Sequence, residues 1–432
     1  MKKLLIISPY FPPSNGADMQ RIRMSLPYFK NYGWEAEVVT VAPIHSDLVK
    51  DERLIESIPT DIRIHEVKAF SKKWTSKIGL GSLALRSLWH YKKYVNKLLQ
   101  TQNFDLIYFS TTQFPILILG AYWKKKFNIP YVIDMQDPWH STYYEDKPKA
   151  ERPPKYWFSY RLNKALEPVA MHKVDGLISV SQAYLDTLES RYPRLMHIPK
   201  KVITFGAFKQ DFDLVKRNLE DFKLNFPIET TFFNFVYVGR GGHDMKDALH
   251  LLFTTFKRGL ITDKEIFDKI RFHFIGTSYA PKGQGIKTIE PIAKQIGIDD
   301  YVFEQTDRIP FYENIFRLIT ADALMIIGSD DPQYTASKIY PYILAERPLL
   351  AFFHPKSSAA QIITDCGAGQ VISLIEPKEQ STNKIYDYLV EASSGKLVSP
   401  NLNWKSFDKY TAENMCKNQC KLFNQVINNE CS

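Results

Sequence analysis

The sequence predicts an α/β protein with two doubly wound parallel sheets, and three observations support that prediction. Its 432 residues suit roughly two domains of ordinary size. Short apolar runs alternate with stretches of helical spacing, which is typical of parallel strands covered on both faces. Two such series occur, separated by a polar stretch near 209–229. We therefore expect one domain over 1–206, a second over 207–403, and a polar helix with no following strand from Trp404 onward.

The expected strands are short and almost continuously apolar. In the first series they are Leu4–Ser8, Ala36–Val41, Ile62–Val67, Asp105–Ser110, Tyr131–Asp134, Gly176–Val180 and Lys201–Thr204. In the second they are Phe233–Val238, Arg271–Ile275, Ala323–Ile327, Leu349–Phe352 and Gln370–Ser373. Ligands of open parallel sheets bind outside the carboxyl ends of the strands. The loops that follow these strands are therefore where we expect the binding residues.

Composition excludes several other classes of protein. With 44% hydrophobic and 24% charged residues, the chain is neither disordered, collagen-like nor a coiled coil. No run of 18 apolar residues predicts a spanning helix, and the four apolar residues Leu4–Ile7 are too few for a secretory leader. Four cysteines in a chain of this length do not form a disulfide framework, and we expect a cytoplasmic protein.

The excess of positive charge, +9 overall, is concentrated in residues 68–100, which hold eight basic residues and no acidic one. An apolar stripe at helical spacing is formed by Ala84, Leu88, Tyr91, Val95 and Leu98. The opposite side carries Arg86, His90, Lys93 and Lys97, with Trp74, Trp89 and Tyr94 interspersed. Such a segment is typical of contact with an anionic membrane surface, although a core helix with a basic solvated face is the alternative. No nucleic-acid-binding signature is present, so we expect no nucleic-acid partner.

The loop after the first expected strand, Ser8–Asp18, leads directly into a helix. Gly16, followed by the small Ala17, lets the backbone approach a ligand closely, and a helix N-terminus favours a phosphate. The alternative is a stiff connection without a ligand.

The loop after the first strand of the second series combines glycines with two cations. Gly239 and Arg240 are followed six residues later by Lys246, at the expected start of a helix. A guanidinium, an ammonium and a helix N-terminus together suit a diphosphate. The pattern is neither a dinucleotide fingerprint nor a Walker loop, and a structural arginine with a surface lysine is the alternative.

Together these motifs resemble the nucleotide-sugar glycosyltransferases of the two-domain GT-B fold, specifically the retaining enzymes of the family 4 group. The resemblance covers nearly the whole chain. It depends on the Ser8–Gly16 loop with Pro12-Pro13, on Gly239-Arg240 with Lys246, and on Ala321–Ala323, Ser337–Tyr340 and Ala345–Ala351. It implies two Rossmann-like domains facing a central cleft, with the helix of 404–432 packing back on the first domain.

The resemblance also implies the roles of individual residues on the donor side. Arg240 and Lys246 would neutralise the donor diphosphate as it leaves, with Gly16 contacting it from the first domain. Ser337 and Lys338 would add phosphate contacts at a helix start, and Asp307-Arg308 lies where the family holds the base. Because side-chain cations stabilise the leaving group, we expect no metal and no cofactor beyond the nucleotide diphospho-sugar. The implied activity is retaining transfer to a saccharide or lipid-linked acceptor in surface polysaccharide biosynthesis.

One departure from the family leaves alternatives open. The family usually has two glutamates with seven residues between them, and this chain has Gln333 and Pro341 at those positions. Asp330 or Asp331, just upstream, could replace one carboxylate or form a solvated turn. A non-catalytic binding or scaffold subunit, or an epimerase of the same architecture, therefore remains an alternative to a transferase.

The acceptor side is expected after the strand Tyr131–Asp134. Two carboxylates, Asp134 and Asp137, precede Trp139 and His140, and such groups can orient a hydroxyl and stack on a sugar. The family holds acidic residues here, and often a histidine near the position of Gln136. We predict Asp137 as the catalytic member, with a capping role before Pro138 as the alternative. The Pro-rich stretch 141–155 is a candidate lid.

Overall fold

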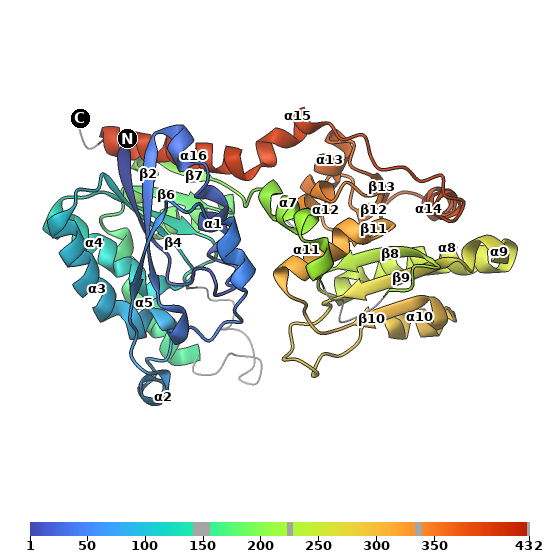
Figure 1. Ribbon diagram of the computed structural model, residues 1–432, viewed down its shortest axis with the longest axis horizontal. Coiled ribbons are helices and arrows are strands. Elements are labelled where there is room, and N and C mark those ends of the chain that lie inside the picture. Colours follow the sequence, from blue (N-terminus) through green and yellow to red (C-terminus); the bar gives the residue numbers. More distant parts are fainter. Residues whose placement is uncertain (141–155, 223–227, 333–338, 430–432) are drawn as a thin grey trace. The chain divides into compact units, whose positions relative to one another are not determined.

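The structure, a computed structural model, describes residues 1–140, 156–222, 228–332 and 339–429 (Figure 1). The chain divides into two compact units. Unit 1 comprises Met1–Gly206 and Ala412–Ser432, and unit 2 comprises Ala207–Thr411. Residues 404–411, which we expected to join the first domain, thus fall in unit 2. Within the described ranges, no helix is long and apolar enough to cross a membrane.

Unit 1 is built on one seven-stranded sheet in the order β3-β2-β1-β4-β5-β6-β7, with every pair parallel. The strands are β1 (Lys2–Ile7), β2 (Trp34–Val41), β3 (Arg63–Val67), β4 (Leu106–Ser110), β5 (Tyr131–Met135), β6 (Gly176–Ser179) and β7 (Lys200–Val202). The central strands are buried on both faces, which explains their continuous apolar sequence.

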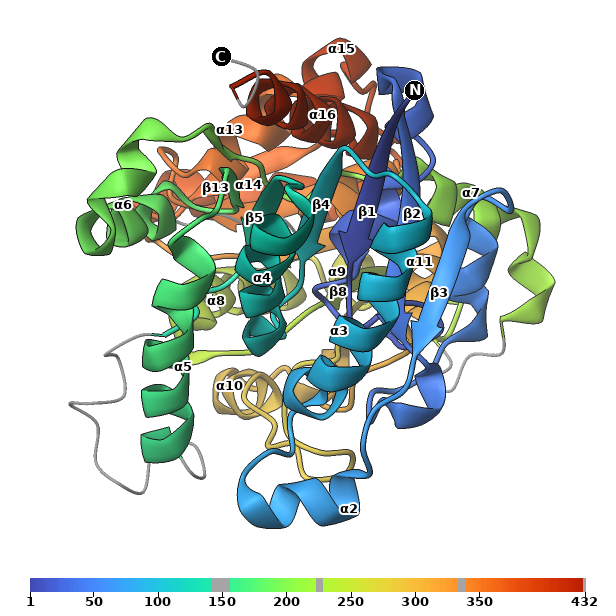
Figure 2. The same cartoon turned by 90° about the vertical axis from the view of Figure 1, so that its left-hand side faces the viewer.

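Helices of unit 1 lie on both faces of this sheet. They are α1 (Gln20–Ser25), α2 (Lys72–Thr75), α3 (Leu83–Thr101), α4 (Ile118–Phe127), α5 (Tyr156–Met171), α6 (Gln182–Arg191) and α16 (Ala412–Asn429). Figure 2 shows α3, α4 and α5 in front of the sheet, where they share one core cluster with it. The long helix α3 is capped by Ser82, whose hydroxyl accepts a hydrogen bond from the Leu85 amide at 3.3 Å.

Unit 2 repeats the plan with a six-stranded parallel sheet in the order β10-β9-β8-β11-β12-β13. Its strands are β8 (Phe233–Val238), β9 (Ile270–Ile275), β10 (Val302–Gln305), β11 (Ala323–Ile327), β12 (Leu349–Phe353) and β13 (Gln370–Ser373). Strand β10 is missing from the sequence prediction, because it has only four residues and alternates buried with half-exposed positions. The predicted α/β class with two doubly wound sheets is confirmed.

The helices of unit 2 are shorter on average and include the polar stretch that we used to separate the two series. They are α7 (Lys209–Arg217), α8 (Lys246–Thr262), α9 (Lys264–Phe267), α10 (Glu290–Ile296), α11 (Phe311–Thr320), α12 (Ile339–Leu344), α13 (Ser358–Asp365), α14 (Lys378–Ser393) and α15 (Trp404–Phe407). Helix α7 is amphipathic: it buries Phe212, Leu214 and Val215 and packs on α11. It is therefore part of unit 2.

Two details of the helix predictions are wrong. The single C-terminal helix is interrupted at Thr411, whose extended backbone (φ −73°, ψ 155°) separates α15 and its following turn from α16. Arg86, expected on the exposed face of α3, is buried and donates hydrogen bonds to the carbonyls of Phe70 and His45, both at 2.9 Å. A buried guanidinium is stabilised when such acceptors surround it.

The strand orders locate the expected ligand sites. In unit 1 the order reverses between β1 and β4, and in unit 2 between β8 and β11. In open parallel sheets, ligands bind beyond the carboxyl ends of the strands at such a reversal. The strand orders therefore favour ligand sites at the loops after β1 and β8, as the motifs predicted.

Candidate functional site

A pocket of about 380 Å³ lies at the carboxyl ends of the unit 1 strands. Its walls come from the loops after β1, β2, β4, β5 and β7. The lining residues are Tyr10, Asn15, Gly16, Ala17, Asp18, Leu48, Thr112, Gln136, Asp137 and Phe205. Two predicted site residues, Gly16 and Asp137, are therefore brought together in one pocket.

Gly16 is closely surrounded by other residues of this pocket. A Cβ atom at this position would lie 2.9 Å from Oδ1 of Asp18 and 3.1 Å from Cδ1 of Leu48. The Gly16 amide donates to the carbonyl of Ser14 at 3.1 Å. The glycine thus allows the loop to fold tightly against its neighbours, and its predicted diphosphate contact stays a prediction.

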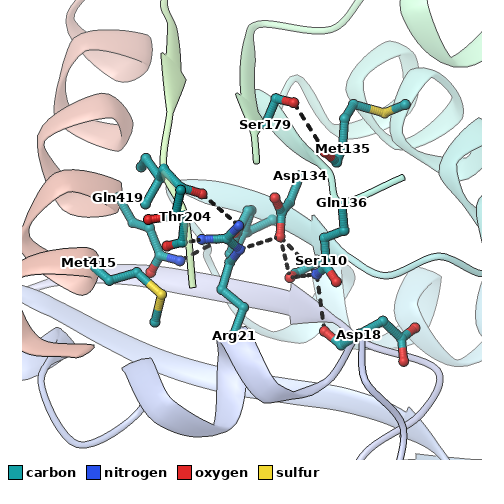
Figure 3. Close-up of polar contacts among 12 residues, drawn as sticks. Asp18, Arg21, Ser110, Asp134, Met135, Gln136, Ser179, Thr204, Met415 and Gln419 are labelled. Carbon is teal, nitrogen blue, oxygen red and sulfur yellow. Dashed lines mark hydrogen bonds and ion pairs between the residues drawn. The ribbon is translucent and has the colours of Figure 1, made fainter. Parts of the chain in front are cut away.

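Beneath the pocket lies a buried ion pair (Figure 3). Nε of Arg21 is 2.7 Å from Oδ2 of Asp134, and both side chains have no exposed surface. The guanidinium also donates to the carbonyls of Ile203 at 2.8 Å and Thr204 at 3.3 Å. A buried charge pair is tolerated when such further hydrogen bonds satisfy it. Asp134, predicted to bind the acceptor, is therefore held in the interior and does not line the pocket.

Gln136 connects this ion pair to the pocket wall. Its amide nitrogen donates to Oδ2 of Asp134 at 2.9 Å, to Oγ of Ser110 at 3.0 Å and to the carbonyl of Asp18 at 3.0 Å. The residue is 7% exposed and lines the pocket. Sequence reasoning did not select Gln136 as a site residue; the family's frequent histidine near this position was the available signal.

Two carboxyl groups of the pocket have altered acidity. Burial raises the pKa of Asp18, although hydrogen bonds from Thr111 and Thr112 act in the opposite direction. Burial also raises the pKa of Asp137, and the charge of Asp18 raises it further. Asp18 is 4% exposed, whereas Asp137 is exposed. Carboxyl groups with raised pKa values in a pocket are candidates for proton transfer.

Trp139 and His140, predicted to bind the acceptor, do not line this pocket. The Trp139 indole is buried, stacks on Phe114 at 5.6 Å between ring centres and donates to Oδ1 of Asn163 at 3.2 Å. Nε2 of His140 lies 3.3 Å from the buried Glu167 carboxylate. Both side chains instead attach the loop after β5 to helix α5.

In unit 2, the predicted phosphate clamp lies in the loop between β8 and α8. Gly239 continues the sheet pairing by donating to the carbonyl of Ile275 at 3.0 Å. The Arg240 guanidinium forms a two-pronged ion pair with Asp244, at 2.6 and 3.0 Å, and holds the pKa of that carboxyl below its usual range. Lys246 is exposed and begins the 17-residue helix α8. Both cations therefore lie near the helix N-terminus, where the helix dipole favours an anion.

The predicted base-binding loop follows β10 and lies against the loop after β9. Asp307 accepts a hydrogen bond from the Gly283 amide at 2.8 Å, and the Arg308 guanidinium lies 4.4 Å from the ring centre of Tyr279. Ser337, Lys338, Gln333 and the candidate lid 141–155 lie outside the described residues.

The two residues considered as substitutes for the missing carboxylates form a local turn. The Asp331 amide donates to Oγ of Ser329 at 3.1 Å, immediately after β11. Pro341 lies within α12. Within the described ranges, no three His, Cys, Asp or Glu side chains are grouped so that they could hold a metal ion.

Comparison with known proteins agrees with the motifs. Residues 29–203 match the model of the family described as Glycosyltransferase Family 4. No curated protein sequence matches the chain. The predicted resemblance to GT-B glycosyltransferases of the family 4 group is confirmed by this match and by the fold of the solved structures described next.

Several solved structures are similar to this chain over nearly its whole length. Anabaena HepE in complex with UDP is 15% identical, covers 98% of this chain and 100% of its own, and has a TM-score of 0.53. Sucrose-phosphate synthase from Thermosynechococcus elongatus is 12% identical, with 99% and 100% coverage and a TM-score of 0.56. A UDP-forming α,α-trehalose-phosphate synthase from Burkholderia xenovorans is 10% identical, with 99% coverage of both chains and a TM-score of 0.55. At these sequence identities, the similarity shows a shared fold alone.

Proposed function

We propose that the protein is a retaining glycosyltransferase that moves a sugar from a nucleotide diphospho-sugar to a saccharide or lipid-linked acceptor in surface polysaccharide biosynthesis. The observation that carries this proposal is the Glycosyltransferase Family 4 match of residues 29–203. The fold supports it, because structures of the similar HepE hold UDP and UDP-glucose. The nucleotide sugar is then a co-substrate, and the reaction uses no other cofactor.

On the donor side, breaking the glycosyl–phosphate bond develops negative charge on the departing diphosphate. Arg240 can bind two phosphate oxygens, Lys246 adds a point charge, and the N-terminus of α8 adds its dipole. Such fixed charges stabilise a leaving group where its charge forms, and in this proposal they replace a divalent metal. Ser337 and Lys338 would add phosphate contacts, and Asp307 and Arg308 would face the base.

On the acceptor side, the unit 1 pocket holds the hydroxyl that receives the sugar. Asp137 is an exposed carboxylate at its wall and can accept the hydroxyl proton or orient the hydroxyl. Gly16, which lines the same pocket, would contact the donor diphosphate. Asp134 acts indirectly, by fixing Gln136.

The test is transfer of a labelled sugar from UDP-, GDP- and ADP-sugars to a saccharide acceptor, with the anomeric configuration of the product read by NMR. We expect one donor to give a product with retained configuration. Arg240→Ala should lower turnover roughly 100- to 1,000-fold, as losing one preorganised donor does elsewhere. The matched control is Arg258→Ala, an exposed arginine near the other end of α8. Normal turnover by Arg240→Ala would exclude the clamp.

One observation favours a second candidate, a non-catalytic binding subunit of a polysaccharide-assembly complex. Pro341 stands in α12 where the family usually has a carboxylate. The same assay separates the two functions, because a binding subunit would bind a nucleotide sugar or saccharide without forming product.

We also propose that unit 1 docks on an anionic membrane at the cytoplasmic face through residues 68–100. Trp74 is 69% exposed and Trp89 is 53% exposed, and each carries a lysine over its ring, Lys77 at 5.1 Å and Lys93 at 5.2 Å. Exposed indole rings beside ammonium groups suit the interface between headgroups and acyl chains.

Sedimentation with vesicles tests this surface. We expect binding to vesicles that contain phosphatidylglycerol and little binding to pure phosphatidylcholine, and weaker binding at high salt. Trp74→Ser with Trp89→Ser should reduce binding at least several-fold, whereas Trp404→Ser, an exposed tryptophan of unit 2, should not. Equal binding to both lipids would contradict the proposal.

A further inference from the structure

The walls of the unit 1 pocket carry negative charge and no positive charge. Asp18 and Asp137 line it, and no lysine, arginine or histidine is among its lining residues. The Arg21 guanidinium lies 4.6 Å from the ring centre of the lining residue Phe205 but is fully buried. Its charge is paired with that of Asp134, and its N–H groups donate to the carbonyls of Ile203 and Thr204. A ligand in the pocket therefore meets carboxylates rather than cations.

The orientation of the Gln136 amide is fixed by its neighbours. All three of its partners accept hydrogen bonds: the Asp134 carboxylate, the Asp18 carbonyl and Oγ of Ser110, whose own proton goes to Asp134 at 2.8 Å. Only the amide nitrogen can occupy a place surrounded by three acceptors. The amide oxygen is consequently left on the other side, and within the described part of the chain it has no hydrogen-bond partner.

Asp137 adds a second acceptor to the wall of the same pocket. Its carboxylate is exposed at the pocket wall and has no hydrogen-bond partner among the residues that the structure describes. Tyr10 and Phe205 supply aromatic rings, which pack against the apolar face of a sugar. The pocket thus offers acceptors and rings to its ligand.

From this chemistry we propose that the pocket selects an acceptor unit that donates hydrogen bonds and carries no negative charge. Neutral sugar hydroxyls, or the ammonium of an amino sugar, match Oε1 of Gln136 and the Asp137 carboxylate. A sugar phosphate or a uronic acid would place like charges together without a compensating cation, which is how a site rejects a competitor. This inference rests on the proposed function and names the acceptor class of that same site.

The Arg21–Asp134 pair has a positioning role in this account. Its buried guanidinium holds the Asp134 carboxylate in an ion pair, and that carboxylate accepts a hydrogen bond from the Gln136 amide nitrogen, which fixes the end of the amide that faces inward. In this account the buried Arg21–Asp134 pair sets the sugar selectivity of the pocket, although no ligand contacts either residue.

The experiment measures direct binding, without donor, of four methyl glycosides of one hexose series to the full chain by saturation-transfer NMR. They are the neutral hexoside, the 2-amino hexoside, the hexoside 6-phosphate and the hexuronide. We expect the first two to bind and the two acids to bind at least tenfold more weakly. Equal or tighter binding of the acids, or binding of none of the four, would overturn the inference.

Two variants sharpen the result. Asp137→Arg should reverse the selectivity, gaining affinity for the 6-phosphate and losing it for the amino hexoside, and it should fold because Asp137 is exposed. Gln136→Leu should weaken the neutral hexoside without making the phosphate bind. Nucleotide-sugar hydrolysis by the unmodified protein, measured separately, reports on the proposed transferase activity. Hydrolysis without the expected selectivity would overturn this inference alone.

Discussion

At the scale of single residues, one carboxylate controls how available the proposed phosphate clamp is. Asp244 holds the Arg240 guanidinium through two contacts. A diphosphate must displace the Asp244 carboxylate before it can bind both Nη1 and Nη2 of Arg240. Gly242 leaves space for the pair in this geometry, because a Cβ there would lie 2.5 Å from Nη1 of Arg240 and the side chains would have to shift. The pKa of Asp244 is lowered by this pair. The stabilisation from the pair is therefore fully present at pH values above the pKa of the unfolded carboxyl, and it is lost as pH falls through the lower folded-state pKa.

Asp244→Asn should therefore increase affinity for a nucleoside diphosphate several-fold at pH 7, because a competing anion next to Arg240 is removed. Calorimetry with UDP, GDP and ADP measures it. Asp247→Asn removes the same charge from the first turn of α8 and should change affinity less. Equal effects of the two variants would show that only the local charge matters, not the contact.

A second residue-scale prediction concerns stability. The pKa of Asp18 is raised, mainly by burial, so its ionised form is disfavoured in the folded state. Between the unfolded value near 3.8 and the higher folded value, the folded state binds more protons, and stability falls as pH rises through that window. Asp18→Asn should therefore stabilise unit 1 more at pH 7 than at pH 4, as measured by urea unfolding. A gain that is independent of pH would contradict this cause.

Residue identities were partly predictable from sequence. Gly16 and Asp137 were selected because they follow expected strands, and both line the pocket. Gln136 follows the same strand as Asp137 but was not selected, because its role depends on partners at Ser110 and Asp18, far away in the sequence. Trp139 and His140 fit a sugar site by residue type, yet their contacts with helix α5 can be seen only in the fold. Whether Arg240 and Lys246 bind a diphosphate stays a prediction.

At the scale of elements, helices approach the sheets closely where glycine faces them. A Cβ at Gly120 of α4 would lie 2.5 Å from Cδ2 of Tyr131 on β5 and 3.0 Å from the Phe109 ring on β4. In an exposed helix, glycine to alanine is favourable by about 1 kcal/mol. Here the methyl group has no space, and overpacking costs about 1–3 kcal/mol.

Gly120→Ala should therefore destabilise unit 1 by up to about 2 kcal/mol net, although alanine is the better helix former. Denaturant unfolding followed by circular dichroism measures the change. Ser190→Ala, an exposed position in α6, should change stability little. A Gly120→Ala protein more stable than the original would contradict the close approach.

Most elements were predictable because the spacing of apolar residues along the sequence follows which side chains are buried in the fold. Three strand ranges, those of β8, β11 and β13, agree with the structure at both ends. Strand β10 was missed because four residues give too short a pattern, and Arg86 was misplaced because helical spacing alone does not reveal the carbonyl groups that surround a buried guanidinium.

At the scale of the whole molecule, unit 1 is assembled from both ends of the chain. Helix α16 buries Phe423 among Trp34 at 5.6 Å, Phe29 at 6.4 Å and Tyr108 at 4.9 Å between ring centres. Val426 of the same helix lies against Gly176, where a Cβ would come within 2.6 Å of it. Unit 1 therefore requires its C-terminal helix for a complete core.

Phe423→Ala should destabilise unit 1 by about 3–5 kcal/mol, the usual cost of removing a buried phenylalanine. Hydrogen exchange should show the loss of protection in β1 and β4 but not in β8 and β11. Lys421→Ala, an exposed change in the same helix, is the control and should leave both sheets protected. Loss of protection throughout unit 2 would contradict the division into units.

The central claim is that unit 2 binds a nucleotide diphospho-sugar through Arg240, and thermal unfolding with UDP-, GDP- and ADP-sugars tests it most directly. Ligand at about 100 times its dissociation constant stabilises by about 2.7 kcal/mol, which raises the midpoint by several degrees. We predict that one of these donors produces this shift in the unmodified protein and in Arg258→Ala, and that Arg240→Ala abolishes it. No shift with any donor, or an equal shift in Arg240→Ala, would contradict the account.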